Sequence, residues 1–250
     1  MILVKNPHSI FAALKNRPEE VDAVVVPDQA TGVWSDIQML ATRHRKLVSG
    51  LPAGGGETSR RGGKSEHGHR SQLGGRQSGH GAILRPKSSA DLGSLLGARS
   101  HKFRLVLILD CIQDPQNLGS IFRTAAFYGV SGIIMTSERS APLTSVVYDV
   151  SSGGVEVVPF AEVINLKQAL EKLKKADFWI MGTSDKTKDD ISAYSRDRNW
   201  AVVFGNEETG MRRLTQESCD VLVKIGGASE FVSSLNVSVA VGSALERMRS

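Results

Sequence analysis

The sequence predicts an α/β protein in which a small N-terminal unit precedes a larger domain built on a parallel sheet. From residue 103 onward, short apolar runs alternate with segments of helical periodicity, which is typical of a parallel sheet covered by helices on both faces. A Gly-rich stretch over residues 50–81, with eleven glycines, interrupts the preceding part of the chain. The composition is that of a globular protein, since 40% of residues are hydrophobic and 23% are charged.

The first unit, residues 1–87, combines helices with short strands. In chain order, we expect a helix over 9–16, a strand over 23–27, a helix over 34–44 and a strand over 82–86. Residues 50–81 have too few apolar side chains to offset the entropy lost on ordering, so a loop is expected there. A linker over residues 88–102 leads to the larger domain, residues 103–250.

The larger domain shows six strand patterns separated by helical ones. Strands are expected over 105–110, 132–136, 155–160, 178–182, 200–205 and 220–225. Helices are expected over 117–128 and 165–176, with a helical turn after Met211 and a terminal helix in which Val237, Val241, Ala244, Leu245 and Met248 share one face. Ligands of such sheets bind beyond the carboxyl ends of the strands, so the loops at those ends are the place to look for a site.

Positive charge is concentrated in one part of the chain. The formal net charge is +5, but residues 43–104 hold thirteen Lys or Arg and three acids, a balance of +10 that leaves −5 for the rest. This favours a polyanion such as RNA as partner, although a solubilising flexible segment would have the same composition. The basic side chains that we expect to contact phosphates are Arg60, Arg61, Lys64, Arg70 and Arg76.

Several classes of protein are disfavoured. No apolar run approaches the roughly 20 residues needed to cross a bilayer, and the first twenty residues lack the layout of a secretory signal, so a cytoplasmic protein is expected. Cys111 and Cys219 are too few for a disulfide framework or a zinc cage. Three histidines in the Gly-rich stretch, His67, His69 and His80, have no Cys or acid pattern around them, so we predict no metal site.

Three strand ends are more crowded with Gly, Asn, Ser and charged residues than the others: "CIQDPQNLGSIFR", "NEETGMRR" and "GGASEFVSSLNVS". The first contains no GxGxxG, which disfavours an ordinary dinucleotide fold and the common methyltransferases with a Gly-rich first loop. It does contain Arg123, whose guanidinium stays charged at any ordinary pH. Taken alone, this arginine would be assigned to a salt bridge on the helix surface.

Within these loops, "DPQNLGSIFRTA", "FGNEETGM" and "SSLNVSVA" resemble, in this order and spacing, the three motifs of the SpoU (TrmH) branch of the SPOUT RNA methyltransferases. The resemblance covers residues 103–250. The run "GMRRLTQESCDVLVKI" and the first unit, ending "RQSGHGAILRP", are similar to the subgroup that methylates a guanosine ribose in large-subunit ribosomal RNA. In that subgroup a small α/β domain that binds RNA precedes the catalytic domain.

The resemblance implies a SPOUT catalytic domain whose C-terminal segment forms a deep trefoil knot and which works as a homodimer. It also implies S-adenosylmethionine as cofactor, held through backbone groups at Gly205, Ile225 and Leu235. Glycine at position 205 would let the backbone approach the adenosyl group, although a glycine that simply ends a strand is the alternative.

Five residues match the family's catalytic positions: Arg123, Asn117, Glu207, Ser234 and Asn236. The resemblance places the fork of Arg123 on the phosphate or ribose of the target nucleotide, where it acts as a perturbed base or lowers the pKa of the hydroxyl. Ordinary alternatives exist for the others: an N-cap for Asn117, a surface acid for Glu207, and helix caps for Ser234 and Asn236.

The chain departs from the family after Ile225. Gly226 and Gly227 stand where the family usually has Pro and Met, and the loop to Ser234 is one residue longer, so a looser cofactor loop with weaker affinity is expected. The sequence thus predicts an S-adenosylmethionine-dependent RNA ribose 2′-O-methyltransferase acting on a guanosine of large-subunit ribosomal RNA. The alternatives are a transfer RNA enzyme, a non-catalytic RNA-binding or ribosome-assembly protein, and a mitochondrial or plastid location.

Overall fold

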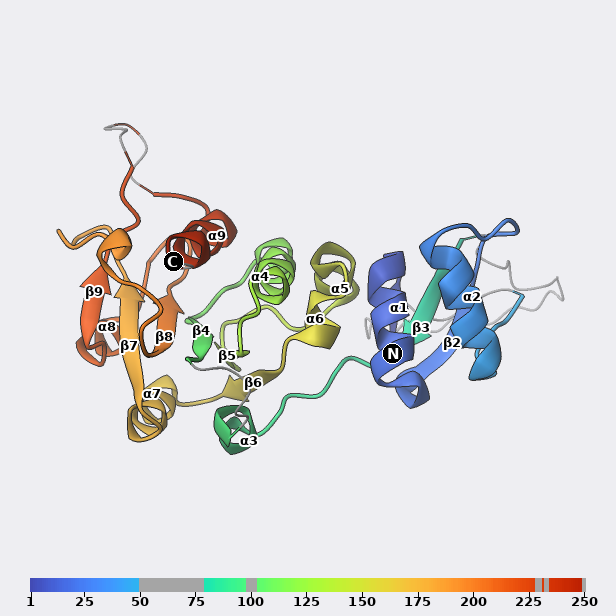
Figure 1. Cartoon of the computed structure of the whole chain (residues 1–250), viewed down its shortest axis with the longest axis horizontal. Coiled ribbons are helices and arrows are strands. Elements are labelled where there is room, and N and C mark those ends of the chain that lie inside the picture. The colour runs from blue at the N-terminus through green and yellow to red at the C-terminus, as the bar shows by residue number, and fades with distance from the viewer. Residues whose placement is uncertain (50–78, 98–102, 228–230, 232–233, 249–250) are drawn as a thin grey trace, which may run out of the picture. The chain divides into compact units, whose positions relative to one another are not determined.

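The computed structural model describes residues 1–49, 79–97, 103–227, 231 and 234–248, and the chain divides into two compact units, Met1–Pro86 and Lys87–Ser250 (Figure 1). Four of the ranges left out lie in the second unit. The fifth, residues 50–78, holds all five basic side chains expected to contact phosphates, Arg60, Arg61, Lys64, Arg70 and Arg76, which therefore lie outside the described residues.

The first unit contains an antiparallel three-stranded sheet in the order β1-β3-β2. Its elements are β1 (Ile2–Val4), α1 (Pro7–Asn16), the 3-10 helix η1 (Pro18–Glu20), β2 (Val21–Val25), α2 (Val33–Arg43) and β3 (Gly81–Leu84). Asn6 caps α1 by accepting from the backbone N–H of His8 at 2.9 Å. Strand β1 was not expected, because three residues are too short to show an alternating pattern.

The second unit contains the predicted parallel sheet, with six strands in the order β6-β5-β4-β8-β7-β9. Its strands are β4 (Leu105–Leu109), β5 (Gly132–Thr136), β6 (Phe160–Val163), β7 (Phe178–Thr183), β8 (Asn199–Phe204) and β9 (Val221–Val223). Its helices are α3 (Leu92–Gly97), α4 (Pro115–Phe127), α5 (Ser145–Ser151), α6 (Gly154–Val157), α7 (Leu166–Lys175), η2 (Ile191–Ala193), α8 (Arg213–Glu217) and α9 (Val237–Arg247).

Helices cover both faces of this sheet. Figure 1 shows α4, α5, α6 and α9 on one face and α3 and α7 on the other. Toward α3 and α7, the core includes Val106 and Ile108 from β4 with Leu170 and Leu173 from α7. On the opposite face the ring of Phe122 in α4 meets Phe160 edge-on, with 5.9 Å between centroids.

The order of the strands reverses between β4 and β8. From β4 the chain builds outward through β5 to β6, whereas β7, β8 and β9 lie on the other side of β4. The last residues of the two strands, Leu109 and Phe204, are paired. A crevice opens outside the carboxyl ends of the strands at such a switch point, so the loops beginning at Asp110 and Gly205 are the place where a ligand is expected.

The strand expected over 155–160 is wrong in its first half. Residues Gly154–Val157 form helix α6, and β6 begins only at Phe160. The valines of this segment predicted a strand, but Gly153 with φ 94° turns the chain into a short helix that packs on α4.

Part of the expected linker over 88–102 is also structured. Residues Leu92–Gly97 form α3, and Leu92 and Leu95 are buried in the core of the second unit. A helix of 6 residues is too short for its apolar spacing to stand out in a sequence.

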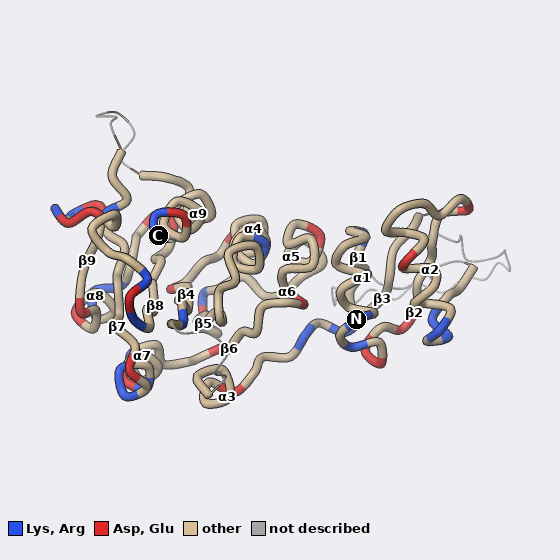
Figure 2. Tube along the Cα trace, viewed as in Figure 1, with Lys and Arg blue, Asp and Glu red and all other residues tan. Residues whose placement is uncertain are grey.

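Figure 2 shows Lys and Arg gathered at the end of α7, where Lys172, Lys174 and Lys175 lie in the last turn and complement the helix dipole.

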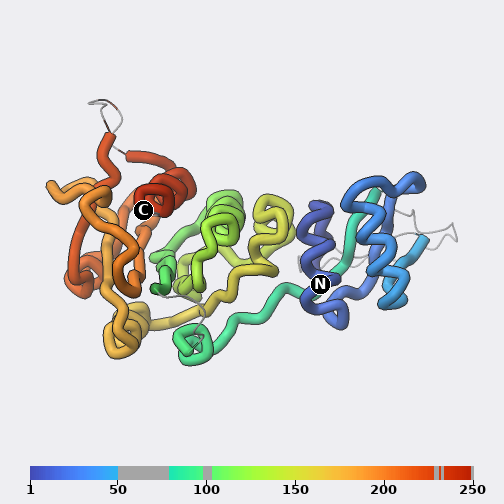
Figure 3. The backbone as a smooth tube through the Cα atoms, viewed as in Figure 1, coloured from blue at the N-terminus to red at the C-terminus, as the bar shows by residue number. Residues whose placement is uncertain are grey.

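Figure 3 follows the backbone from β9 to α9, but residues 228–230 and 232–233 of this connection are outside the described residues, so the trefoil knot stays a prediction. Among the described residues, every helix is too short or too polar to cross a bilayer.

The close packing of α6 on α4 leads to a test. A Cβ at Gly154 would lie 2.5 Å from the carbonyl oxygen of Phe122, so Gly154→Ala should lower the free energy of unfolding by about 1 to 3 kcal/mol in urea denaturation. Gly97→Ala is the control, because a Cβ there would meet no atom within 4 Å. Equal midpoints for Gly154→Ala and the unchanged chain would contradict this packing.

Candidate active site

Helix α4 begins with Asp114, whose carboxylate accepts from the backbone N–H of Gln116 at 2.8 Å, and Pro115 takes the first helical position. Asn117 therefore lies at the third helical position, and the alternative of an N-cap role for Asn117 is wrong. Its side chain is buried and does not cap the helix, so its amide can bond to other segments.

The amide of Asn117 joins the three predicted motif loops. Its Nδ2 donates to Oε1 of Glu207 at 2.9 Å, and its Oδ1 accepts from Nδ2 of Asn236 at 3.0 Å. Glu207 belongs to the loop after β8 and Asn236 precedes α9. Three of the five expected catalytic residues are thus connected by direct hydrogen bonds.

Asn236 also caps α9, because its Oδ1 accepts from the backbone N–H of Ser238 at 2.9 Å. The capping role and the contact with Asn117 use opposite ends of the same amide, so both expected roles coexist. Ser234 is exposed two residues before this cap and makes no hydrogen bond to the described residues. Glu207 accepts from amides, and no arginine of the described chain pairs with it.

The loop after β8 is a tight turn between Gly205 and Met211. Asn206 and Gly210 exchange backbone hydrogen bonds of 3.1 and 2.9 Å, and Gly210 has φ +69°. A Cβ on Gly205 would lie 2.2 Å from the backbone nitrogen of Met211. The turn itself therefore requires glycine at 205, a reason different from the approach to an adenosyl group that we expected.

Asn206 was missed by the sequence analysis and connects this turn to β4. Its Nδ2 donates to the carbonyl of Cys111 at 3.0 Å, and its Oδ1 accepts from the backbone N–H of Glu208. Cys111 has φ 65°, a left-handed conformation that costs a non-glycine residue about 1 to 2 kcal/mol. The N–H of Cys111 donates to Oγ1 of Thr136, so both of its backbone groups are held.

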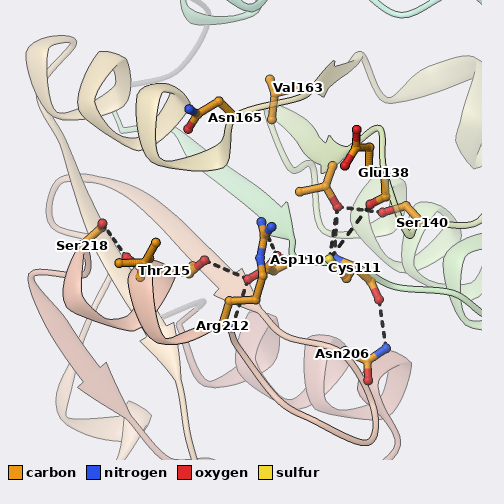
Figure 4. A network of polar contacts seen from close by, with 12 residues as sticks. Asp110, Cys111, Glu138, Ser140, Val163, Asn165, Asn206, Arg212, Thr215 and Ser218 are labelled. Carbon is orange, nitrogen blue, oxygen red and sulfur yellow. Dashed lines mark hydrogen bonds and ion pairs between the residues drawn. The ribbon is translucent and has the colours of Figure 1, made fainter.

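A buried carboxylate lies at the same edge of the sheet (Figure 4). Asp110 is fully buried, and its Oδ1 lies 2.8 Å from Nη2 of Arg212. Oδ2 accepts from the hydroxyl of Thr215 at 2.8 Å and from the backbone N–H of Arg212 at 3.3 Å. These bonds join the end of β4 to the start of α8. The sequence analysis missed this group, because the partners of Asp110 lie more than 100 positions away in the chain.

Arg123 is not part of the network. Its side chain is exposed and makes no hydrogen bond or ion pair with the described residues. It follows Asn117 by six positions, which places it about 120° around the helix axis from Asn117. The structure thus brings Asn117, Glu207 and Asn236 together and leaves the arginine open to solvent.

The three expected cofactor positions have unused backbone groups. In the described part of the chain, the backbone N–H and C=O of Gly205, Ile225 and Leu235 take part in no hydrogen bond. Unpaired backbone groups at the carboxyl edge of a sheet suit a ligand with adenine, ribose and amino-acid atoms, so these positions fit S-adenosylmethionine.

No cluster of His, Cys, Asp and Glu able to hold a metal occurs in the ranges that the structure describes. His67 and His69 fall outside those ranges, while the ring of His80 packs edge-on against Trp34 with 6.0 Å between centroids. Burial raises the pKa of the Cys219 thiol to about 12, so this cysteine is a protonated structural side chain at neutral pH.

A sequence model described as the SpoU rRNA Methylase family matches residues 104–246. The 23S rRNA (guanosine-2'-O-)-methyltransferase RlmB of Vibrio vulnificus is 43% identical over 152 residues, which are 61% of this chain and 60% of that protein. Alignments with curated relatives of this kind cover 53% to 66% of the relatives' own length.

Solved structures share the fold. The SpoU methyltransferase AviRb from Streptomyces viridochromogenes, in complex with the cofactor AdoMet, is 19% identical and has a TM-score of 0.68, covering 98% of this chain and 88% of that one. The A. aeolicus TrmH/SpoU tRNA modifying enzyme is 25% identical, with a TM-score of 0.54, and covers 63% of this chain and 79% of that one.

The buried carboxylate gives a stability test of this edge of the sheet. Thr215→Val keeps the shape of the side chain but removes a donor to Asp110, so it should lower the free energy of unfolding by about 1 to 3 kcal/mol. Ser218→Ala on the same segment is the control, since its hydroxyl donates only an exposed hydrogen bond, to the carbonyl of Leu214 at 2.7 Å. If the two variants unfold at the same urea concentration, the hydroxyl of Thr215 does not stabilise Asp110.

Proposed function

The chain belongs to the SpoU rRNA methylase family, and from this premise we propose that it is an S-adenosylmethionine-dependent RNA ribose 2′-O-methyltransferase. The favoured substrate is a guanosine of large-subunit ribosomal RNA, by analogy with the Vibrio relative. The observation that carries the proposal is the hydrogen-bonded chain from Asn236 through Asn117 to Glu207, which connects the three loops at the carboxyl edge.

A ribose 2′-hydroxyl is a weak nucleophile until its proton is removed or polarised. The bound cofactor supplies a methyl group already activated by its positive sulfur. The protein then has to align the oxygen, the methyl carbon and the sulfur, and to help the proton leave. In this proposal Asn117, Glu207 and Asn236 keep α4, the β8 loop and α9 in fixed register, which holds the site in a productive geometry.

In this proposal the guanidinium of Arg123 binds the phosphate or the ribose of the target nucleotide. Its five N–H donors are not used by the described residues, so the whole fork is available to a phosphate or a ribose oxygen. A fixed positive charge beside the 2′-hydroxyl lowers the pKa of that hydroxyl, and phosphate or solvent takes the proton. In the same proposal Ser234, which is exposed before the cap of α9, contacts this ligand.

The first unit and the basic residues of the Gly-rich stretch, Arg60, Arg61, Lys64, Arg70 and Arg76, would bind the RNA through phosphates. The separate first unit favours ribosomal RNA over transfer RNA, which remains the second candidate.

We also propose a cytoplasmic homodimer with the C-terminal knot of the family. Two large apolar side chains support an interface on α4 and α9, because Phe127 is 80% exposed and Val239 is 54% exposed.

The function is tested by transfer of a labelled methyl group to total RNA. We expect label on large-subunit ribosomal RNA, at a ribose 2′-oxygen, with S-adenosylmethionine as donor. Arg123→Ala should lower kcat/KM by about a hundredfold or more while leaving cofactor affinity intact, because the lost donor acts on the reacting oxygen. Lys175→Ala, which removes an exposed cation of α7, is the matched control.

Three results decide between the candidates. Label on transfer RNA alone would replace the ribosomal substrate with the second candidate. Cofactor binding without transfer to any RNA would favour the non-catalytic alternative. Full activity in Arg123→Ala would remove this arginine from the chemistry.

A further inference from the structure

The loop after β9 is held in a way that only a non-proline residue at position 226 allows. The backbone N–H of Gly226 donates to Oδ2 of Asp190 at 3.1 Å, and its carbonyl accepts from Nη2 of Arg247 at 3.2 Å. A proline has no N–H to donate, and a Cβ at 226 would lie 2.5 Å from the same carboxylate oxygen. The departure from the family therefore coincides with a specific contact.

Asp190 is the centre of this contact. Besides Gly226, its carboxylate accepts from the backbone N–H of Ser192 at 2.9 Å, from the Ser192 hydroxyl at 2.7 Å, and from Nη1 of Arg247 at 3.2 Å. The hydrogen bonds from Ser192, with those from Gly226 and the charge of Arg247, lower the pKa of Asp190 to about 2. The carboxylate is thus ionised at neutral pH and connects its own turn to the loop after β9 and to helix α9.

Backbone pairing holds the loop from its other side. The N–H of Lys224 donates to the carbonyl of Asp189 at 2.8 Å, and the N–H of Ile191 donates to the carbonyl of Lys224 at 3.0 Å. The residues on both sides of Ile225 are therefore anchored, whereas the backbone groups of Ile225 itself have no partner among the described residues. Ile225 thus presents a backbone N–H and C=O, unpaired among the described residues, between two anchored neighbours.

Helix α9 connects the loop after β9 to the other site residues. Its N-cap residue Asn236 is bound to Asn117, and Arg247 in its last turn binds Asp190 and Gly226. The loops at Ile225 and at Leu235, both expected to hold the cofactor, are therefore anchored to the two ends of the same helix.

We infer that Asp190 and Arg247 form a clamp that positions Ile225 for the methyl donor and so sets the cofactor affinity of this chain. The inference rests on the proposed function, since the ligand is its cofactor. In this inference the contacts at Gly226 restrain the backbone next to Ile225 in place of a proline, whereas residues 228–230 and 232–233 of the same loop lie outside the described residues. Asp190 and Arg247 are positioning residues and do not touch the reacting atoms.

The test compares cofactor and RNA parameters in the full chain. Asp190→Ala should raise the Kd of S-adenosylmethionine, measured by titration calorimetry, and its KM about tenfold, with kcat and the KM for RNA changed by less than about twofold. Asp190→Asn retains an acceptor for the Gly226 N–H and should recover part of the affinity. Arg213→Ala, which breaks the exposed pair with Glu217 on α8, is the control.

An unchanged Kd in a folded Asp190→Ala would overturn the clamp, as would an equal rise of both KM values. Should Asp190→Ala fail to fold, Arg247→Gln decides: it should weaken cofactor binding about threefold or more, and unchanged binding would overturn the clamp. If the unchanged chain itself binds no S-adenosylmethionine, both the clamp and the proposed function are overturned. If the variants bind the cofactor and transfer methyl groups normally, only the clamp is overturned and the proposed function stands.

Discussion

The side-chain amide of Asn117 is the group on which the arrangement of the site depends. It donates to the loop after β8 and accepts from the cap of α9, a residue 119 positions away in sequence. An amide buried in this position has to be satisfied on both sides, because an unpaired polar group there costs about 1 to 3 kcal/mol. The same requirement therefore stabilises the fold and brings the three loops into one place.

Other contacts at the carboxyl edge make this arrangement rigid. The buried carboxylate of Asp110 ties β4 to the start of α8, and Asn206 holds the strained turn at Cys111. Asp190 and Arg247 hold the loop after β9 through the backbone N–H and C=O of Gly226. The loops that carry Gly205 and Ile225 are thus restrained next to backbone groups that have no partner among the described residues. The proposed in-line methyl transfer depends on such preorganisation, since in that proposal the protein's part is mainly alignment.

The sequence predicted the features that periodicity or a local motif encodes. The apolar strands and the leucines of α7 were found because burial imposes a repeat on them. Asn117, Glu207 and Asn236 were found through the motifs that contain them. Helix α6 was mistaken for a strand, since valines fit both and the deciding contact is the close approach of Gly154 to Phe122. Asp110, Asn206 and Asp190 were missed because their partners lie 102, 95 and 36 positions away, a separation that no local pattern records.

The most direct test of this account is a double-mutant cycle between Asn117 and Glu207. Asn117→Ala, Glu207→Ala and the double variant would be compared by the free energy of S-adenosylmethionine binding and of unfolding. The account predicts a coupling energy of about 1 kcal/mol or more in both quantities, because each single variant already breaks the shared hydrogen bond. Strictly additive effects would show that the three loops are held by something else, and the site as described would be contradicted.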